Sequence, residues 1–149
     1  MSKSKDEDPM RHMKAITRGR LRLMWQMAEA GDDLSAEDAR TIKVMRDHPE
    51  YADLWGRLDE LSDAEIERDG VNPIAHIIAH TTVENQIAEN EPKEVRQTIK
   101  KLMRQGYTRH DAIHAVGGVL MDEIWYILKE NRPFDEAKYL RDLKALTRK

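Results

Sequence analysis

Apolar residues recur at intervals of three and four along most of the chain, which is the spacing of amphipathic α-helices. The pattern predicts helices over residues 17–30, 35–47, 49–61, 73–89, 92–105, 108–130 and 135–146. No segment alternates apolar and polar residues for more than a few positions, so the sequence predicts no β-strand. The expected architecture is an all-α bundle of six to seven helices.

Residues with strong capping preferences mark the boundaries of these helices. Ser35, Asn72 and Thr108 each precede a predicted helix and carry the short oxygen-bearing side chains that favour the N-cap. Gly106 follows a predicted helix, where the left-handed conformation of a C-cap suits glycine. Residues 62–70 are mostly polar and are interpreted as a connector.

The chain fits one helical domain with a short tail. Residues 1–14 are polar, mixed in charge and without a period, which predicts a disordered N-terminal tail. Residues 15–149 then form a single helical domain. With 149 residues, such a chain buries roughly two-thirds of the surface of its unfolded state.

The composition excludes several classes of protein. The sequence has no cysteine, which rules out disulfides, thiolate metal sites and a cysteine nucleophile. No apolar run approaches the roughly 20 residues that cross a bilayer, and residues 1–8 lack the apolar stretch of a secretory signal. We therefore expect a cytoplasmic protein with no membrane partner.

A basic face lies on the helix predicted within residues 92–109, which carry a local charge of +5. This face is a weak candidate for binding a partner or nucleic acid and comprises Lys93, Arg96, Lys100 and Arg104. Nucleic acid is disfavoured because residues 29–69 carry a charge of −9, which offers compensation within the molecule. An acidic protein and a second copy of the chain both remain compatible partners.

Four of the six histidines form two pairs with the same spacing, His76 with His80 and His110 with His114. Residues four apart lie on one face of an α-helix, so both imidazoles of a pair can reach one metal ion. Glu84 follows His80 at the same interval and extends the first pair into a stripe. The pairs therefore predict a metal site between two helices.

Both stripes fall on the apolar side of their helices. At about 100° per residue, the polar residues of 73–89 collect on the arc opposite His76, and the second pair shares its side with the apolar residues of 108–130. A carboxylate on the apolar side is costly unless it is paired or bound to a metal. These residues predict a set of ligands for a divalent metal, zinc or iron, with manganese also compatible: His76, His80, Glu84, His110 and His114.

Two adjacent glycines lie inside the helix predicted over residues 108–130. Gly117 and Gly118 lower the stability of that helix by about 1 kcal/mol each relative to alanine. The missing side chains predict a close approach of the helix over 73–89. Such an approach would bring the two histidine pairs together, although tight packing alone would explain it too.

The sequence names no reaction. If the protein is an enzyme, the metal would activate water or a small oxidant, and Asp111 or Asp122 would be the proton acceptor. The string from His110 to His114 differs from the zincin motif HExxH by Asp111 in place of Glu. A peptidase is disfavoured, because aspartate is one methylene shorter and no strand is predicted to hold a substrate. The alternative is a non-catalytic interaction or adaptor protein whose histidines form a structural hydrogen-bond network.

The sequence resembles the bacterial domain of unknown function 1841 family. The similar stretches are His48-Pro49-Glu50-Tyr51, residues 72–86 with the first histidine pair, and residues 109–125 with the second. They span about residues 35–130. The resemblance implies an acid after the first histidine of the second pair, where Asp111 stands, and another near Asp122 or Gly118. The family has no assigned activity, so the resemblance supports a histidine site without implying a reaction.

Overall fold

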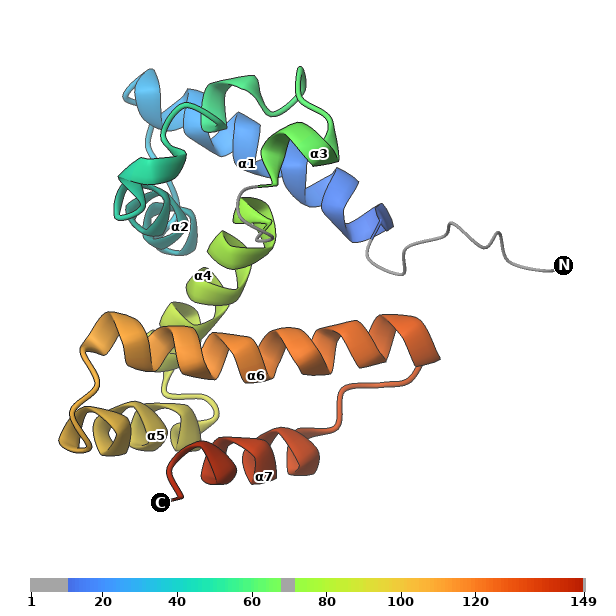
Figure 1. Cartoon of the computed structure of the whole chain (residues 1–149). Coiled ribbons are helices and arrows are strands. Elements are labelled where there is room, and N and C mark those ends of the chain that lie inside the picture. The colour runs from blue at the N-terminus through green and yellow to red at the C-terminus, as the bar shows by residue number, and fades with distance from the viewer. Residues whose placement is uncertain (1–10, 68–71, 149) are drawn as a thin grey trace, which may run out of the picture.

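The computed structural model describes residues 11–67 and 72–148, and these contain helices and turns but no strand. The long elements are α1 (Arg11–Glu29), α2 (Ala36–Arg46), α4 (Pro73–Glu89), α5 (Lys93–Arg104), α6 (Arg109–Glu130) and α7 (Glu136–Leu146) (Figure 1). Between α2 and α4 lie two 3₁₀ turns, η1 (Pro49–Tyr51) and η2 (Trp55–Arg57), and the one-turn helix α3 (Asp63–Ile66). The prediction of an all-α fold is confirmed.

The expected N-caps begin their helices with hydrogen bonds to the first turn. Ser35 Oγ accepts from the Asp38 amide at 3.1 Å, and Thr108 Oγ1 accepts from the Asp111 amide at 3.0 Å. Asn72 Oδ1 accepts from two amides of α4 at 2.9 and 3.2 Å. Each side chain satisfies backbone donors that have no partner within the helix.

The segment between α2 and α4 differs from the sequence prediction. Residues 49–61 form η1, η2 and turns instead of one short helix. Trp55, Leu58 and Leu61 are three residues apart and all buried, which suits the three-residue period of 3₁₀ structure. The predicted connector also contains α3, which starts with reciprocal hydrogen bonds between Ser62 and Glu65, a capping box.

The first helix starts earlier than expected. α1 begins at Arg11, so residues 11–14, predicted as part of a disordered tail, are helical. The rest of that predicted tail, residues 1–10, lies outside the described residues. Among the helices of the described ranges, none is both long and apolar enough to cross a bilayer.

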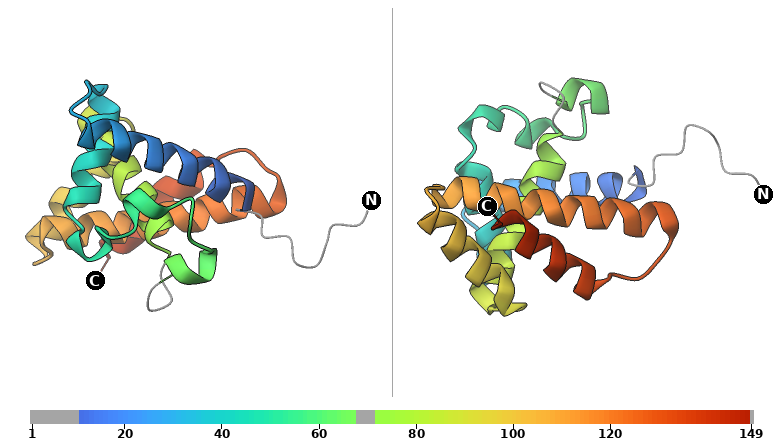
Figure 2. Two further views of the ribbon diagram at one scale, coloured as in Figure 1. Left: turned by 90° about the horizontal axis from the view of Figure 1, so that it is seen from above. Right: turned by 60° about the horizontal axis from the view of Figure 1, so that its bottom comes forward.

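Two apolar clusters meet along α4. One joins α1, α2 and the 3₁₀ segment to Ile74 and Ile77 in the first half of α4. The other joins α5, α6 and α7 to Val83 in the second half of α4. Figure 1 shows α4 running from the α1–α3 layer down to the α5–α7 layer, and Figure 2 shows the same arrangement from two further directions. Because α4 contributes to both clusters, it fixes the two layers relative to each other.

α6 crosses α4 closely at one of the two glycines. A Cβ atom on Gly117 would lie 3.5 Å from the Ala79 Cβ, at ordinary van der Waals distance. A Cβ on Gly118 would meet nothing within 4 Å. The predicted close approach is therefore found at Gly117, whereas Gly118 faces open space.

A buried carboxylate connects α6 to the segment that follows it. The Glu123 side chain is fully buried and forms ion pairs with Arg132 Nη2 at 2.7 Å and Lys138 Nζ at 3.3 Å. The Arg132 guanidinium beside it holds the pKa of Glu123 below its ordinary value, against the opposing effect of burial. The charged form of Glu123 is thus the one that the fold stabilises.

We expect Glu123→Gln to lower the free energy of unfolding by about 3 kcal/mol near neutral pH, because two cations lose their buried partner. Asp142→Asn is the matched control, because Asp142 pairs with the same lysine at 2.9 Å but is 42% exposed. The control should change stability little. Since the folded-state pKa of Glu123 is depressed, the difference between wild type and Glu123→Gln should vanish as pH falls through that pKa. Urea unfolding at several pH values measures this difference in stability. Equal effects of the two variants near neutral pH would contradict the role of Glu123 as a stabilising buried ion-pair partner.

Candidate metal centre

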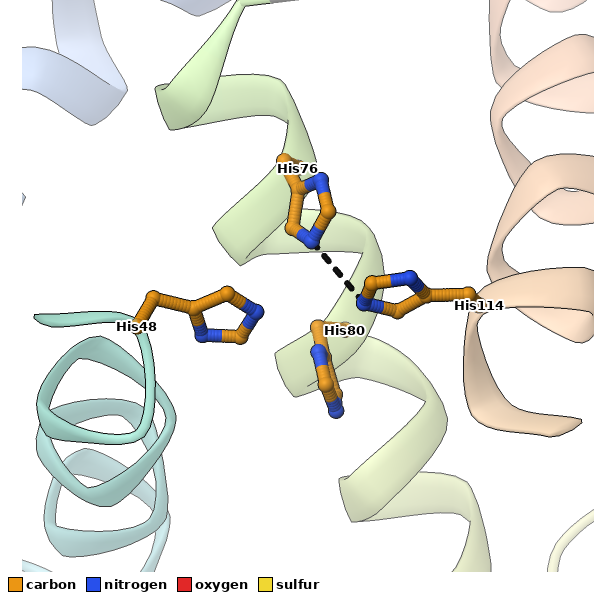
Figure 3. A group of neighbouring side chains, drawn as sticks. All are labelled: His48, His76, His80 and His114. Atoms are coloured by element: carbon orange, nitrogen blue, oxygen red, sulfur yellow. Dashed lines mark hydrogen bonds between the residues drawn. The ribbon is translucent and has the colours of Figure 1, made fainter. Parts of the chain in front are cut away.

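Four histidines converge where α2, α4 and α6 meet. Each of His48, His76, His80 and His114 offers one ring nitrogen, and these four atoms lie within 4.8 Å of one another. Figure 3 shows the rings gathered around a common space, with His48 after α2, His76 and His80 on α4, and His114 on α6. The structure thus brings together three of the four paired histidines, His76, His80 and His114, and adds His48 from a third segment as a ligand candidate.

His48 is oriented by a backbone hydrogen bond. Its Nδ1 lies 2.7 Å from the Val44 carbonyl oxygen. Because a carbonyl oxygen only accepts hydrogen bonds, Nδ1 is the donor, and in the neutral ring the lone pair is therefore on Nε2. The residue is only 2% exposed, and Nε2 has no hydrogen-bond partner within the described part of the chain. A buried acceptor without a partner is costly, and a metal ion would satisfy it.

The other three rings are in mutual contact. His76 Nε2 and His114 Nε2 are 2.9 Å apart, so one nitrogen donates to the other (Figure 3). The ring of His80 lies 5.1 Å from those of both His48 and His114, measured between centroids. His80 Nδ1 is buried and, over residues 11–67 and 72–148, has no hydrogen-bond partner. Two buried ring nitrogens, on His48 and His80, thus lack partners in this cluster.

Burial keeps these rings uncharged. Desolvation, followed by repulsion from neighbouring histidines, lowers the pKa of His80 to about 3 and that of His114 to about 4. The pKa of His76 is lowered for the same reasons. Neutral imidazole is the form that binds metals. The folded protein therefore presents metal-binding lone pairs at neutral pH.

His110 lies at the rim of the four-histidine cluster. Its ring centroid is 4.1 Å from that of His114 and 5.0 Å from that of His80. It is exposed, however, and its nitrogens are not among the four that converge most closely. The expectation that both pairs point equally inward is therefore not met, because His110 stands in the first turn of α6, where the helix end reaches solvent.

The Glu84 carboxylate is paired with an arginine. Both of its carboxylate oxygens accept hydrogen bonds from the Arg109 guanidinium, at 2.7 and 3.2 Å. Glu84 is not part of the group of converging ligand atoms. The carboxylate on the apolar side of α4 is thus satisfied by pairing rather than by the histidine cluster. A role for Glu84 as a metal ligand stays a prediction that this arrangement does not favour.

The remaining residues predicted from the sequence lie around this centre or away from it. Asp111 and Asp122 are both exposed, and the charge of Asp111 acts on His114 by raising its pKa. On α5, the guanidinium of Arg96 donates to the Ile87 carbonyl at 2.6 Å. Lys93, Lys100 and Arg104 are exposed. The roles of these acids and bases are untested by the structure and remain predictions.

His48 was not predicted as a ligand from the sequence. It belongs to no pair at helical spacing, because it follows the C-terminus of α2 and precedes Pro49. The available signal was its place in the His48-Pro49-Glu50-Tyr51 stretch that carried the family resemblance. Tyr51 forms part of the same surroundings, with its ring centroid 6.0 Å from those of His48 and His76.

Comparison with known proteins assigns a family. The family model for a domain of unknown function, DUF1841, matches residues 14–145. The chain belongs to the DUF1841 family. The match is wider than the expected 35–130 and includes most of α1 and most of α7, so the DUF1841 domain contains both apolar clusters. No curated protein and no solved structure matches the chain.

The depressed pKa values predict how the stability of the DUF1841 chain depends on pH. An unfolded chain binds protons at its histidines below about pH 6.5, whereas folded His76, His80 and His114 resist protonation. The contribution of these three histidines to the free energy of unfolding is therefore complete above that pH and is lost as pH falls. The melting temperature of chelator-treated protein should drop by several degrees from about pH 7 to about pH 5.

His80→Gln should flatten this dependence, because glutamine does not titrate in this range. Differential scanning calorimetry across the pH range measures both proteins. A dependence of equal steepness in the variant would contradict the view that the buried ring resists protonation.

Proposed function

We propose that this DUF1841 chain binds one divalent metal ion, zinc or iron, through His48, His76, His80 and His114. The observation that carries the proposal is the buried, unpartnered Nε2 of His48 beside three further rings. The Val44 carbonyl holds the proton on the opposite nitrogen. Hydrogen bonding of the second ring nitrogen to a backbone carbonyl is the usual support of a metal-bound histidine.

The spacing of the nitrogens is compatible with a metal ion. In a tetrahedral zinc site with bonds of 2.0–2.1 Å, the ligand nitrogens are about 3.3 Å apart. The four nitrogens here lie within 4.8 Å of one another, and His76 Nε2 and His114 Nε2 are 2.9 Å apart. Small rotations of the side chains would equalise these distances.

The chemistry of the donors favours zinc or iron. All four converging ligands are imidazoles, and the chain has no cysteine. Magnesium and calcium prefer oxygen ligands, whereas imidazole suits zinc and iron. A site that keeps all four histidines is closed and structural, whereas one that uses three leaves a position for water or substrate.

A second candidate is a non-catalytic interaction protein whose histidines form a structural network. The observation that favours it is the direct hydrogen bond of 2.9 Å between His76 and His114, because a ring that donates to its neighbour needs no metal. This alternative predicts a stable fold in the absence of metal.

Elemental analysis of untagged protein, prepared both in air and without oxygen, distinguishes the two. We expect about one metal ion per chain in wild type, and we expect this metal to raise the melting temperature. His48→Gln and His80→Gln should lose both the metal and this gain in melting temperature. Both substitutions remove a buried ligand but keep a polar side chain of similar size.

His110→Gln and Glu84→Gln are the matched controls, because these residues lie beside the cluster without converging on its centre. Both should retain about one metal ion per chain. Absence of metal from all wild-type preparations, with His48→Gln and His80→Gln as stable as wild type, would favour the structural network instead.

A further inference from the structure

A cavity of about 370 Å³ lies beside the histidine cluster, between α4 and α6. His76, His80 and His114 form part of its wall, and most of the remainder is small or apolar, including Ala79, Gly118 and Met121. Its volume falls in the range of small-molecule sites. The cavity reaches the surface, because Gly118 is exposed. A molecule in it would touch three of the histidines as well as small and apolar residues.

The positive charge of a metal ion bound by the four histidines favours an anion in this cavity. Four neutral imidazoles would leave the two positive charges of a divalent ion uncompensated within the group of ligands. The nearby carboxylates do not supply that charge directly, because Glu84 is paired with Arg109. Glu50 and Asp111, whose charges act on His76 and His114, are exposed and screened by solvent.

The side-chain oxygen of the other polar lining residue, Asn72, is already engaged. Asn72 lines the cavity, but its Oδ1 accepts the two hydrogen bonds that cap α4, which leaves only its amide NH2 to bind a ligand. An uncharged polar ligand would find few partners there, whereas an alkyl or aryl body would be covered by alanine, glycine and methionine. The lining therefore favours a molecule with one anionic end and an apolar body.

We propose that this cavity binds a small monocarboxylic acid with an apolar tail, its carboxylate at the metal and its tail between α4 and α6. This inference rests on the proposed metal site. The carboxylate of the bound acid would be an additional metal ligand or would replace one imidazole. Gly118 would then be a specificity-determining position. Gly118 lines the cavity, and a Cβ atom there would meet nothing within 4 Å, so a larger side chain has room to extend over the cavity.

The test uses the full-length protein loaded with Co²⁺, whose visible spectrum reports changes in the ligands. Hexanoate should change the spectrum saturably and bind at least ten-fold more tightly than acetate, because its tail leaves water. Hexanol should bind at least ten-fold more weakly than hexanoate, because it lacks the charge. Equal responses to hexanoate and acetate, or to hexanoate and hexanol, would overturn the inference.

Gly118→Leu should weaken hexanoate binding at least ten-fold while cobalt per chain and the response to acetate stay unchanged. Gly19→Leu is the matched control, because Gly19 is also a helical glycine with nothing within 4 Å of its Cβ position, and it should bind hexanoate like wild type. Undiminished hexanoate binding by Gly118→Leu would overturn the cavity as the site. Absence of stoichiometric cobalt in wild type would overturn the metal site itself, whereas bound cobalt without a hexanoate response overturns the carboxylate site alone.

Discussion

Burial and mutual repulsion disfavour the protonated form of imidazole rings that are packed together, which leaves their lone pairs available to a cation. This constraint governs the centre of the molecule, where His76, His80 and His114 meet beside His48. The helices that carry them are anchored by two apolar clusters on either side of the site. Packing energy from these clusters therefore holds the rings together despite their unfavourable desolvation.

The position of α4 explains why the site lies where it does. α4 presents Ile74 and Ile77 to one cluster and Val83 to the other, and the two histidines it contributes lie between. α6 packs against α4 at Gly117, where a Cβ would lie in ordinary van der Waals contact with the Ala79 Cβ. The same crossing leaves open space at Gly118, so tight packing and the neighbouring cavity arise from adjacent residues.

Local regularities of the sequence predicted most of the fold and three of the four converging histidines. Helical periodicity and the caps at Ser35, Asn72 and Thr108 marked the helices, because these signals act within a few residues. The pairs at residues 76–80 and 110–114 were visible for the same reason. His48 was missed because its nearness to α4 depends on tertiary packing of the 3₁₀ segment. The pairing of Glu84 with Arg109 likewise depends on the crossing of α4 and α6, which helical spacing does not encode.

The most direct test of the central claim is anomalous diffraction at the zinc absorption edge from crystals of the protein loaded with one equivalent of zinc. The account predicts a single strong peak enclosed by the ring nitrogens of His48, His76, His80 and His114, at about 2.0–2.1 Å from those that bind it. A peak elsewhere on the surface, or no peak with His76 and His114 still hydrogen-bonded to each other, would contradict it.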